Sequence, residues 1–323
     1  MFEFFANTFG YVLNFIYNLV NNYGVAIILF TILVKIILLP ISIKQQRTMK
    51  KSAKLQEQVK AIQFKYKNDP EKMNQEMMSL YKAENMSPLS GCLSSIIQII
   101  LLLSIFYLVR SPLTFMKHLN EYMVNKNDTI EVVQQLGKDN SVKISEVSDE
   151  EKNKIVPIIN YYENKINENE NMSLGGYSEI SVIKYFGDSD EKIKLNMGFL
   201  GIDLSEVPNQ NMTDFRVWII PVLYIVSSFI SIRLTTAMQQ KNSKKKEKVI
   251  DITEDGEKEK KDEANELDMT AQTSKTMSWL MPIMAISIAF VAPLGLALYW
   301  LVNNVLMIIE RVILDKVLKA EEE

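Results

Sequence analysis

Long uncharged apolar stretches alternate with charged segments along the chain. A bilayer core roughly 30 Å thick needs about 20 apolar residues in a helix. Three of the stretches have about this length, so each predicts one membrane-spanning helix. They run from Val25 to Ile43, interrupted only by Lys35, from Leu93 to Val109, and from Val217 to Ile232.

The fourth apolar stretch runs from Thr276 to Ile309 and contains 34 residues without a charge. As one helix it would be about 51 Å long, which exceeds a single crossing. Pro293 and Gly295 lie near its middle and predict a tight turn between two short helices. The pattern therefore predicts an all-α integral membrane protein with five transmembrane helices.

Two further helical segments are predicted outside the spans. The N-terminal residues are apolar at helical spacing, which is typical of an interfacial helix on the outer membrane surface. The charged segment between the first two spans predicts a cytoplasmic helical hairpin. The chain then divides into an outer interfacial helix (1–21), the first span (22–43), the hairpin (44–90), the second span (91–110), an extracytoplasmic acidic loop (111–214), the third span (215–235), a cytoplasmic charged loop (236–275), the fourth span (276–292), the fifth span (293–311) and a cytoplasmic tail (312–323).

The distribution of charge predicts the orientation of these spans. Residues 44–91 carry ten Lys and Arg against five Asp and Glu, whereas residues 111–214 carry ten Lys against eighteen acidic residues. By the positive-inside rule the first loop is cytoplasmic. Five spans then place the N-terminus outside and the C-terminus in the cytoplasm. Within the acidic loop, the Asn, Glu and Lys content of residues 118–195 predicts a small or partly disordered insert.

The composition leaves little room for catalytic chemistry. The chain has one cysteine, Cys92, and one histidine, His118, which are predicted to lie on opposite sides of the membrane. A disulfide or multi-cysteine metal site within the chain is therefore excluded. The sequence also has no Walker loop, HExxH or GxGxxG motif. We expect neither enzymatic activity nor a cofactor.

Polar side chains recur along one face of several spans, and such residues avoid lipid because they are costly in hydrocarbon. The spacing is i, i+3, i+4, i+7 in the third span and again in the fifth. These positions together with Lys35 predict a hydrated groove, although the serines alone are more typical of hydrogen bonds between helices. The predicted groove residues are Thr31, Lys35, Gln98, Tyr224, Ser227, Ser228, Ser231, Trp300, Asn303 and Asn304.

Lys35 is the charged residue of the predicted groove. It precedes Lys44 by nine residues, so its backbone lies about 13 Å inside the cytoplasmic end of the span. Burying a lysine charge at mid-bilayer costs about 3 kcal/mol on insertion scales. We expect no Asp or Glu in the spans to pair with Lys35, which implies water around its ammonium group. The alternative is that the side chain extends to the membrane surface.

The predicted hairpin divides at Asn68-Asp69-Pro70, where Asp69 is an expected N-cap and Pro70 the first helical residue. Each arm carries a narrow apolar stripe among lysines. Packing of the two arms on each other explains the stripes, but methionines also adapt to varied apolar partners. The predicted contact residues are Leu55, Val59, Ile62, Tyr66, Met73 and Met77.

Several short segments occur in a specific order: Leu38-Leu39-Pro40 at the end of the first span, Ser87-Pro88-Leu89-Ser90-Gly91-Cys92, the run from Phe199 to Ser205, and Leu298-Tyr299-Trp300 before Asn304. With this order the chain resembles the YidC family of membrane protein insertases in its Gram-positive-like, five-span form. The sequence differs from the family pattern in having Lys35 in place of an arginine, and Ser87, Ser231 and Glu310 where amides are usual.

The resemblance implies a bacterial membrane protein insertase and folding chaperone. Its groove would open to the cytoplasm and to lipid, with a basic residue attracting acidic residues of the substrate. The implied partners are nascent membrane proteins, the lipid bilayer, the Sec translocon, the signal recognition particle pathway and the ribosome, but not DNA. Alternatives are a membrane assembly factor without insertase activity and a channel or transporter. Transporters usually carry internal repeats with broken helices, and five unlike spans show none.

Overall fold

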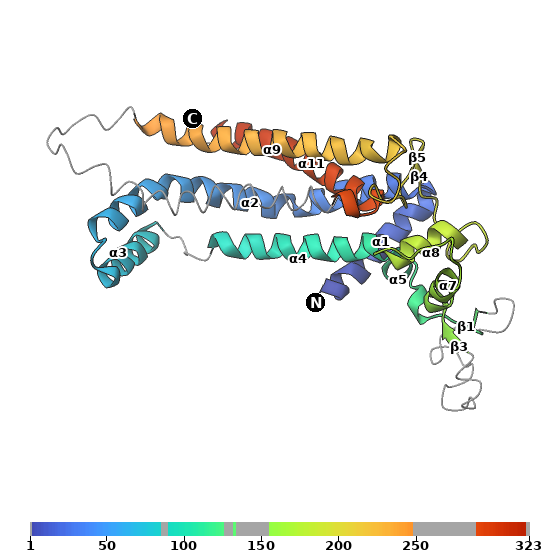
Figure 1. Cartoon of the computed structure of the whole chain (residues 1–323). Coiled ribbons are helices and arrows are strands. Elements are labelled where there is room, and N and C mark those ends of the chain that lie inside the picture. Colours follow the sequence, from blue (N-terminus) through green and yellow to red (C-terminus); the bar gives the residue numbers. More distant parts are fainter. Residues whose placement is uncertain (1, 85–89, 126–131, 134–154, 248–288, 321–323) are drawn as a thin grey trace. The chain divides into compact units, whose positions relative to one another are not determined.

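The computed structural model describes residues 2–84, 90–125, 132–133, 155–247 and 289–320, and these residues are mostly helical (Figure 1). The elements are α1 (Phe2–Val20), α2 (Tyr23–Lys65), α3 (Pro70–Ala83), α4 (Ser90–Arg110), α5 (Pro112–Phe115), η1 (Leu119–Glu121), β1 (Met123–Asn125), β2 (Val132–Val133), β3 (Ile155–Pro157), α7 (Ile158–Asn167), α8 (Ser178–Phe186), β4 (Gly198–Phe199), β5 (Ile202–Asp203), α9 (Arg216–Glu247) and α11 (Leu294–Ala320).

The chain forms two compact units. The first unit comprises Met1–Thr31, Ile100–Pro221 and Ala289–Trp300, and the second comprises Ile32–Ile99, Val222–Ile288 and Leu301–Glu323. The four long helices α2, α4, α9 and α11 each contribute to both units.

Among the described residues, three helices are long and apolar enough to cross a membrane: Tyr23–Thr48, Arg216–Leu234 and Leu294–Val317. They correspond to the first, third and fifth predicted spans. The second predicted span corresponds to the helix α4 of 21 residues, of which Ile99–Arg110 is the described apolar part. Residues 276–288 of the predicted fourth span (276–292) lie outside the described residues. The count of five spans therefore stays a prediction.

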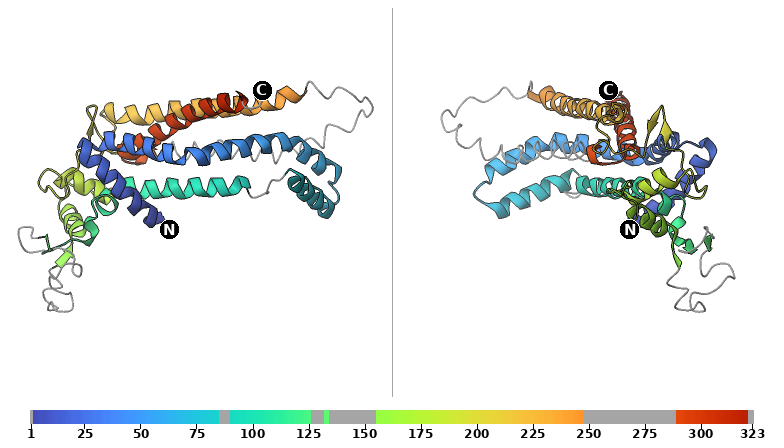
Figure 2. Two further views of the ribbon diagram at one scale, coloured as in Figure 1. Left: turned by 180° about the vertical axis from the view of Figure 1, so that it is seen from behind. Right: turned by 45° about the vertical axis from the view of Figure 1, so that its right-hand side comes forward.

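The first span and the first arm of the predicted hairpin are one continuous helix of 43 residues (Figure 2). We expected a boundary at residue 43, but α2 continues through Pro40 to Lys65. The helix then ends at a short turn, and α3 begins at Pro70. The helix-turn-helix is thus present, while its cytoplasmic location stays a prediction.

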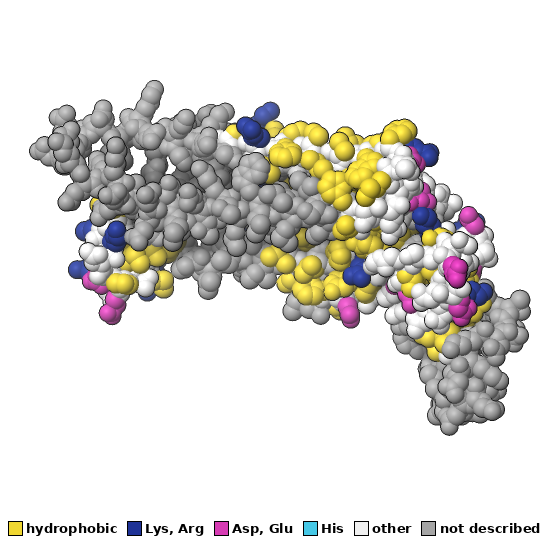
Figure 3. Space-filling model, viewed as in Figure 1, with side chains coloured by type: hydrophobic (Ala, Val, Ile, Leu, Met, Phe, Trp, Pro, Cys, Tyr) yellow, Lys and Arg dark blue, Asp and Glu magenta, His cyan; other side chains and the backbone are white. Residues whose placement is uncertain are grey.

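The helix α9 has polar side chains on its buried face and apolar side chains on its exposed face. Ser227, Ser228 and Ser231 are 6–7% exposed, whereas Val226 and Ile230 on the other face are 50% and 51% exposed. Hydrophobic side chains are visible over much of the described surface along α9 (Figure 3). A soluble protein would place these residues the other way round. The arrangement is that expected of helices surrounded by lipid.

The first unit contains a folded part of the predicted insert. The strands β2, β1 and β3 form an antiparallel sheet, and α7 and α8 pack together through buried residues that include Ile158, Tyr162 and Ile183. The Tyr162 hydroxyl donates to Asp190 Oδ2 at 2.8 Å. The described residues from 155 to 195 therefore form a small folded part, which is one of the two alternatives expected for the insert. The short strands also make the fold mostly helical rather than all-α.

The segment from Phe199 to Ser205 begins with a tight hairpin of β4 and β5. Leu200 and Gly201 at its turn both have positive φ, 51° and 78°, as a two-residue hairpin turn requires. The ring of Phe199 lies against Gly24, where an added Cβ would approach it to 2.6 Å. Asn22 at the start of α2 donates to the Gly198 carbonyl at 2.6 Å. The hairpin thereby fixes the junction between α1 and α2.

The residues after this hairpin form hydrogen bonds with the turn that precedes α11. The amides of Leu294 and Gly295 donate to the carbonyls of Glu206 and Leu204, both at 2.9 Å. The Asn209 amide donates to the Phe290 carbonyl at 3.1 Å. Helix ends leave backbone groups without partners inside the helix, and this one loop supplies partners to two such ends.

The start of α3 confirms the predicted cap. Asp69 Oδ1 accepts a hydrogen bond from the Lys72 amide at 3.1 Å, and Pro70 occupies the first helical turn. We expect Asp69→Ala to destabilise α3 by about 1 kcal/mol, because the Lys72 amide loses its acceptor. The measurement is hydrogen exchange of the first-turn amides, which should quicken in Asp69→Ala but little in Asp69→Asn. If the first-turn amides of Asp69→Ala exchanged at the wild-type rate, the cap would contribute nothing to the stability of α3.

Candidate functional site

Polar residues of α9 and α11 meet in the second unit. The Asn304 side-chain amide donates to Ser227 Oγ at 3.0 Å and to Ser228 Oγ at 3.1 Å. Ser227 Oγ in turn donates to the Tyr224 carbonyl at 2.8 Å. All four residues are buried, so the serine stripe and Asn304 join the two helices by hydrogen bonds.

This contact bears on the two interpretations of the polar stripes. The serine hydroxyls that contact Asn304 serve helix packing, which was the alternative to a groove. Tyr224 and Ser231 are buried on the same face of α9, and Asn303 is partly exposed beside Asn304. The lining of a groove by these residues stays a prediction.

Lys35 has an acidic partner. Its Nζ lies 3.5 Å from Glu310 Oε2, and the two side chains are 24% and 15% exposed. Lys35 belongs to the apolar part of α2, and Glu310 follows the uncharged stretch of α11. Both lie in the second unit. The helices therefore place an ion pair within two candidate membrane spans.

The ion pair shows that the prediction of a lysine without an acidic partner was wrong. We expected no acidic residue in the spans to pair with Lys35 and inferred water around a lone ammonium group. Glu310 comes directly after the uncharged stretch that ends at Ile309, so the uncharged length alone leaves it out, although the predicted fifth span (293–311) contains it. A signal was nevertheless present: Asn303, Met307 and Glu310 follow i, i+4, i+7, so Glu310 continues the polar stripe by one turn.

The remaining predicted groove residues are distributed differently. Thr31 and Trp300 belong to the first unit. Thr31 is buried, and its hydroxyl donates to the Ile27 carbonyl one turn earlier at 2.6 Å. Gln98 lies within α4, but its side chain is outside the described residues.

The predicted contact residues of the hairpin are only partly buried. Leu55 is buried, whereas Val59, Ile62, Tyr66, Met73 and Met77 are partly exposed, and α3 has no buried residue. The ammonium groups of Lys65 and Lys72 lie 5.2 Å and 5.6 Å from the centre of the Tyr66 ring. The second of these contacts connects the start of α3 to the turn after α2.

A buried acid stands out in the first unit. Glu179 of α8 accepts hydrogen bonds from the amides of Leu113 and Thr114 at 2.7 and 3.0 Å and from the Thr114 hydroxyl at 2.6 Å. Burial raises the pKa of Glu179, and these hydrogen bonds offset part of the increase. The carboxyl group thus caps the N-terminus of α5, which is a structural role.

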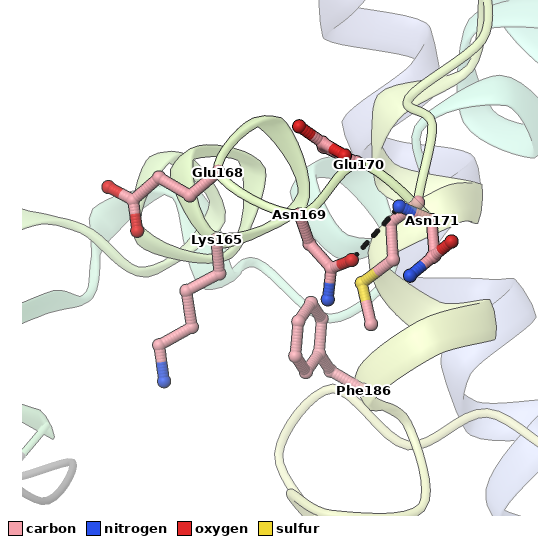
Figure 4. A pocket seen from close by; sticks show the side chains of 7 residues that line it. Lys165, Glu168, Asn169, Glu170, Asn171 and Phe186 are labelled. Atoms are coloured by element: carbon pink, nitrogen blue, oxygen red, sulfur yellow. Dashed lines mark hydrogen bonds between the residues drawn. The ribbon is translucent and has the colours of Figure 1, made fainter.

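The first unit also has an open depression beside the end of α7. Its described lining residues do not gather around a common point as the partners of Glu179 do. In Figure 4, Asn169 Oδ1 accepts a hydrogen bond from the Asn171 amide at 3.0 Å. This bond closes a local turn after α7 and explains why Asn169 points inward. The lining residues, most of them exposed, are Lys165, Glu168, Asn169, Glu170, Asn171, Met172 and Phe186.

Comparison with known proteins identifies the family. Residues 15–322 match the family model described as 60Kd inner membrane protein. Over 109 residues, 34% of this chain and 20% of the relative, the chain is 43% identical to proteins named "Membrane protein insertase YidC". These relatives come from Francisella tularensis subspecies novicida, mediasiatica and tularensis. The matched part thus spans about one fifth of the length of these curated relatives. The chain belongs to the 60Kd inner membrane protein family, that is, the YidC/Oxa1 family of the bacterial cell membrane.

Proposed function

We propose that this protein inserts small membrane proteins into the bacterial cell membrane and assists their folding. The single observation that carries the proposal is the charged and polar set of Lys35, Glu310 and Asn304 on apolar helices of the second unit. Polar groups at such positions are costly and mark functional paths in membrane proteins. The insertase activity in this proposal comes from the similar proteins, which are named membrane protein insertases.

In the proposed mechanism, the substrate enters a groove that is open to the cytoplasm and to lipid. Lys35 attracts an acidic residue of the incoming segment, while the apolar part of the substrate moves between helices into the bilayer. No covalent chemistry is needed, because transfer of apolar residues into lipid supplies the driving force. In the second unit, the proposed lining of the groove consists of Lys35, the polar face of α9, and Asn303 and Asn304 of α11.

The orientation belongs to the same proposal. The N-terminus lies outside, α1 rests on the outer surface, and the hairpin of α2 and α3 projects into the cytoplasm. The exposed apolar face of α1, with Phe4, Phe15 and Leu19 each at least 65% exposed, suits the boundary between water and lipid. The Sec translocon, the signal recognition particle pathway and the ribosome are partners in this scheme.

The test is insertion of a single-span substrate with one aspartate in its translocated segment into liposomes that contain the purified protein. We expect Lys35→Ala to insert this substrate about fivefold less well, equivalent to roughly 1 kcal/mol of lost attraction. Lys35→Arg should retain the charge and the activity. Lys44→Ala is a matched control, because it removes an exposed lysine from the same helix.

Three outcomes separate the functions. Insertion by the wild-type protein without other components supports an insertase, and its absence favours an assembly factor. Leakage of small anions through the liposomes favours a channel. Equal insertion by Lys35→Ala and the wild type contradicts the role of the lysine charge.

A further inference from the structure

Glu310 changes what Lys35 can do for a substrate. The two side chains form a pair of zero net charge, with Lys35 Nζ and Glu310 Oε2 3.5 Å apart. A substrate carboxylate that approaches the pair is attracted by the ammonium group and repelled by the resident carboxylate. The net attraction is therefore weaker than that of a lone lysine at the same position.

The geometry leaves the pair open to exchange. The side chains are 24% and 15% exposed, so the pair is neither fully buried nor on the free surface. The separation of 3.5 Å is longer than the 2.7–2.9 Å or so of a tight charge-assisted hydrogen bond. A lysine ammonium has three donors on a flexible stem, so it can turn from one carboxylate to another.

On these grounds we propose that Glu310 is the resident counter-ion of Lys35 and that an acidic residue of the substrate displaces it. The inference rests on the proposed insertase function and adds a determinant of substrate selectivity. Glu310 keeps the ammonium group paired between substrates, and its carboxylate limits the preference for acidic segments. The same carboxylate gives a basic residue of a substrate a partner.

The test uses the full-length protein in liposomes of phosphatidylethanolamine and phosphatidylglycerol. Three single-span substrates differ only in having Asp, Asn or Lys at one translocated position. The readout is the ratio of Asp-substrate to Lys-substrate insertion, with the Asn substrate as reference. The variants are Lys35→Gln, Glu310→Gln and the double variant, and Asp315→Asn is the control that removes another carboxylate from α11.

The proposal predicts a distinct result for each variant. Glu310→Gln should raise the Asp preference about threefold over the wild type, because Lys35 no longer has a competing anion. Lys35→Gln should shift the preference toward the Lys substrate, because Glu310 no longer has the Lys35 ammonium group as a partner. The double variant should discriminate by charge less than either single variant, and Asp315→Asn should behave like the wild type.

A second measurement does not depend on insertion. If the pair forms, each single substitution leaves one charge without this partner, so both should lower the melting temperature in detergent. The double variant should then melt higher than the sum of the two single shifts predicts. Additive shifts, or the same fractional loss for all three substrates in Glu310→Gln, would overturn the exchange model. Absence of any insertion by the wild type, with non-additive shifts intact, would instead overturn the proposed function.

Discussion

Replacing Gly10 by alanine is expected to lower the free energy of unfolding of the first unit by about 3 kcal/mol. A Cβ at this position would lie 1.7 Å from the Phe115 carbonyl oxygen and 2.6 Å from its carbon. Both atoms belong to the backbone of α5, so the clash cannot be relieved by turning a side chain. The helices α1 and α5 would have to separate along their contact.

The sign of this effect is opposite to that of helix propensity. Alanine in the interior of a helix is favoured over glycine by about 1 kcal/mol, so an unhindered Gly10→Ala would stabilise α1. Gly176→Ala is the matched control, because an added Cβ there has no atom within 4 Å. Gly24→Ala should be intermediate, since its clash is with the side chain of Phe199, whose ring atoms at 2.6 Å can turn away but whose Cβ at 2.8 Å cannot.

The melting temperatures of the three variants in detergent rank the three destabilising effects. We expect Gly10→Ala to melt lowest, Gly24→Ala next and Gly176→Ala close to the wild type. If Gly10→Ala melted at or above the wild-type temperature, α1 would not be packed on α5 as described.

Loss of the Glu179 carboxyl group is the second large effect expected. Glu179 is 7% exposed and accepts three hydrogen bonds from Leu113 and Thr114. Glu179→Ala leaves two backbone amides at the start of α5 without their acceptor, at a cost of roughly 1–3 kcal/mol each. Glu179→Gln keeps one oxygen for these amides and should lose much less.

The comparison of Glu179→Ala with Glu179→Gln separates the loss of the acceptor from the loss of the charge. Chemical unfolding of both variants gives the two free energies. Equal destabilisation would mean that the negative charge, rather than the acceptor, stabilises the start of α5.

The same residue predicts a dependence on pH. Burial raises the pKa of Glu179 in the folded protein, so the folded state holds a proton at a pH where the unfolded state has lost it. The contribution is therefore greatest below the pKa of the unfolded state and falls as the pH rises through the raised folded pKa. As the pH rises from about 4, the melting temperature of the wild type should fall relative to that of Glu179→Gln until the buried carboxyl group has lost its proton.

The spans that the sequence predicts best are those in which apolar length alone decides the structure. The first, third and fifth predicted spans correspond to candidate membrane helices of the structure. Asp69 and Pro70 were also sufficient to predict the start of α3, because a cap and a fixed φ act locally. Local signals of this kind need no knowledge of the rest of the fold.

Contacts between distant parts of the chain were not predictable in the same way. The stripe on α9 predicts an inward polar face, but not that Asn304 would donate to two of its serines. The pairing of Lys35 with Glu310 depends on the relative register of two helices, which spacing within one helix does not determine. The fold of the acidic insert depends on buried contacts such as that of α7 with α8, and average composition conceals them.

The loop after β5 has a consequence for how the molecule is made. Its carbonyl groups at Leu204 and Glu206 leave the ribosome well before the amides of Leu294 and Gly295 that donate to them. The first unit therefore cannot be completed while the chain is growing through α9. During synthesis, the carbonyl groups of Leu204 and Glu206 therefore stay without these partners until the start of α11 has been made.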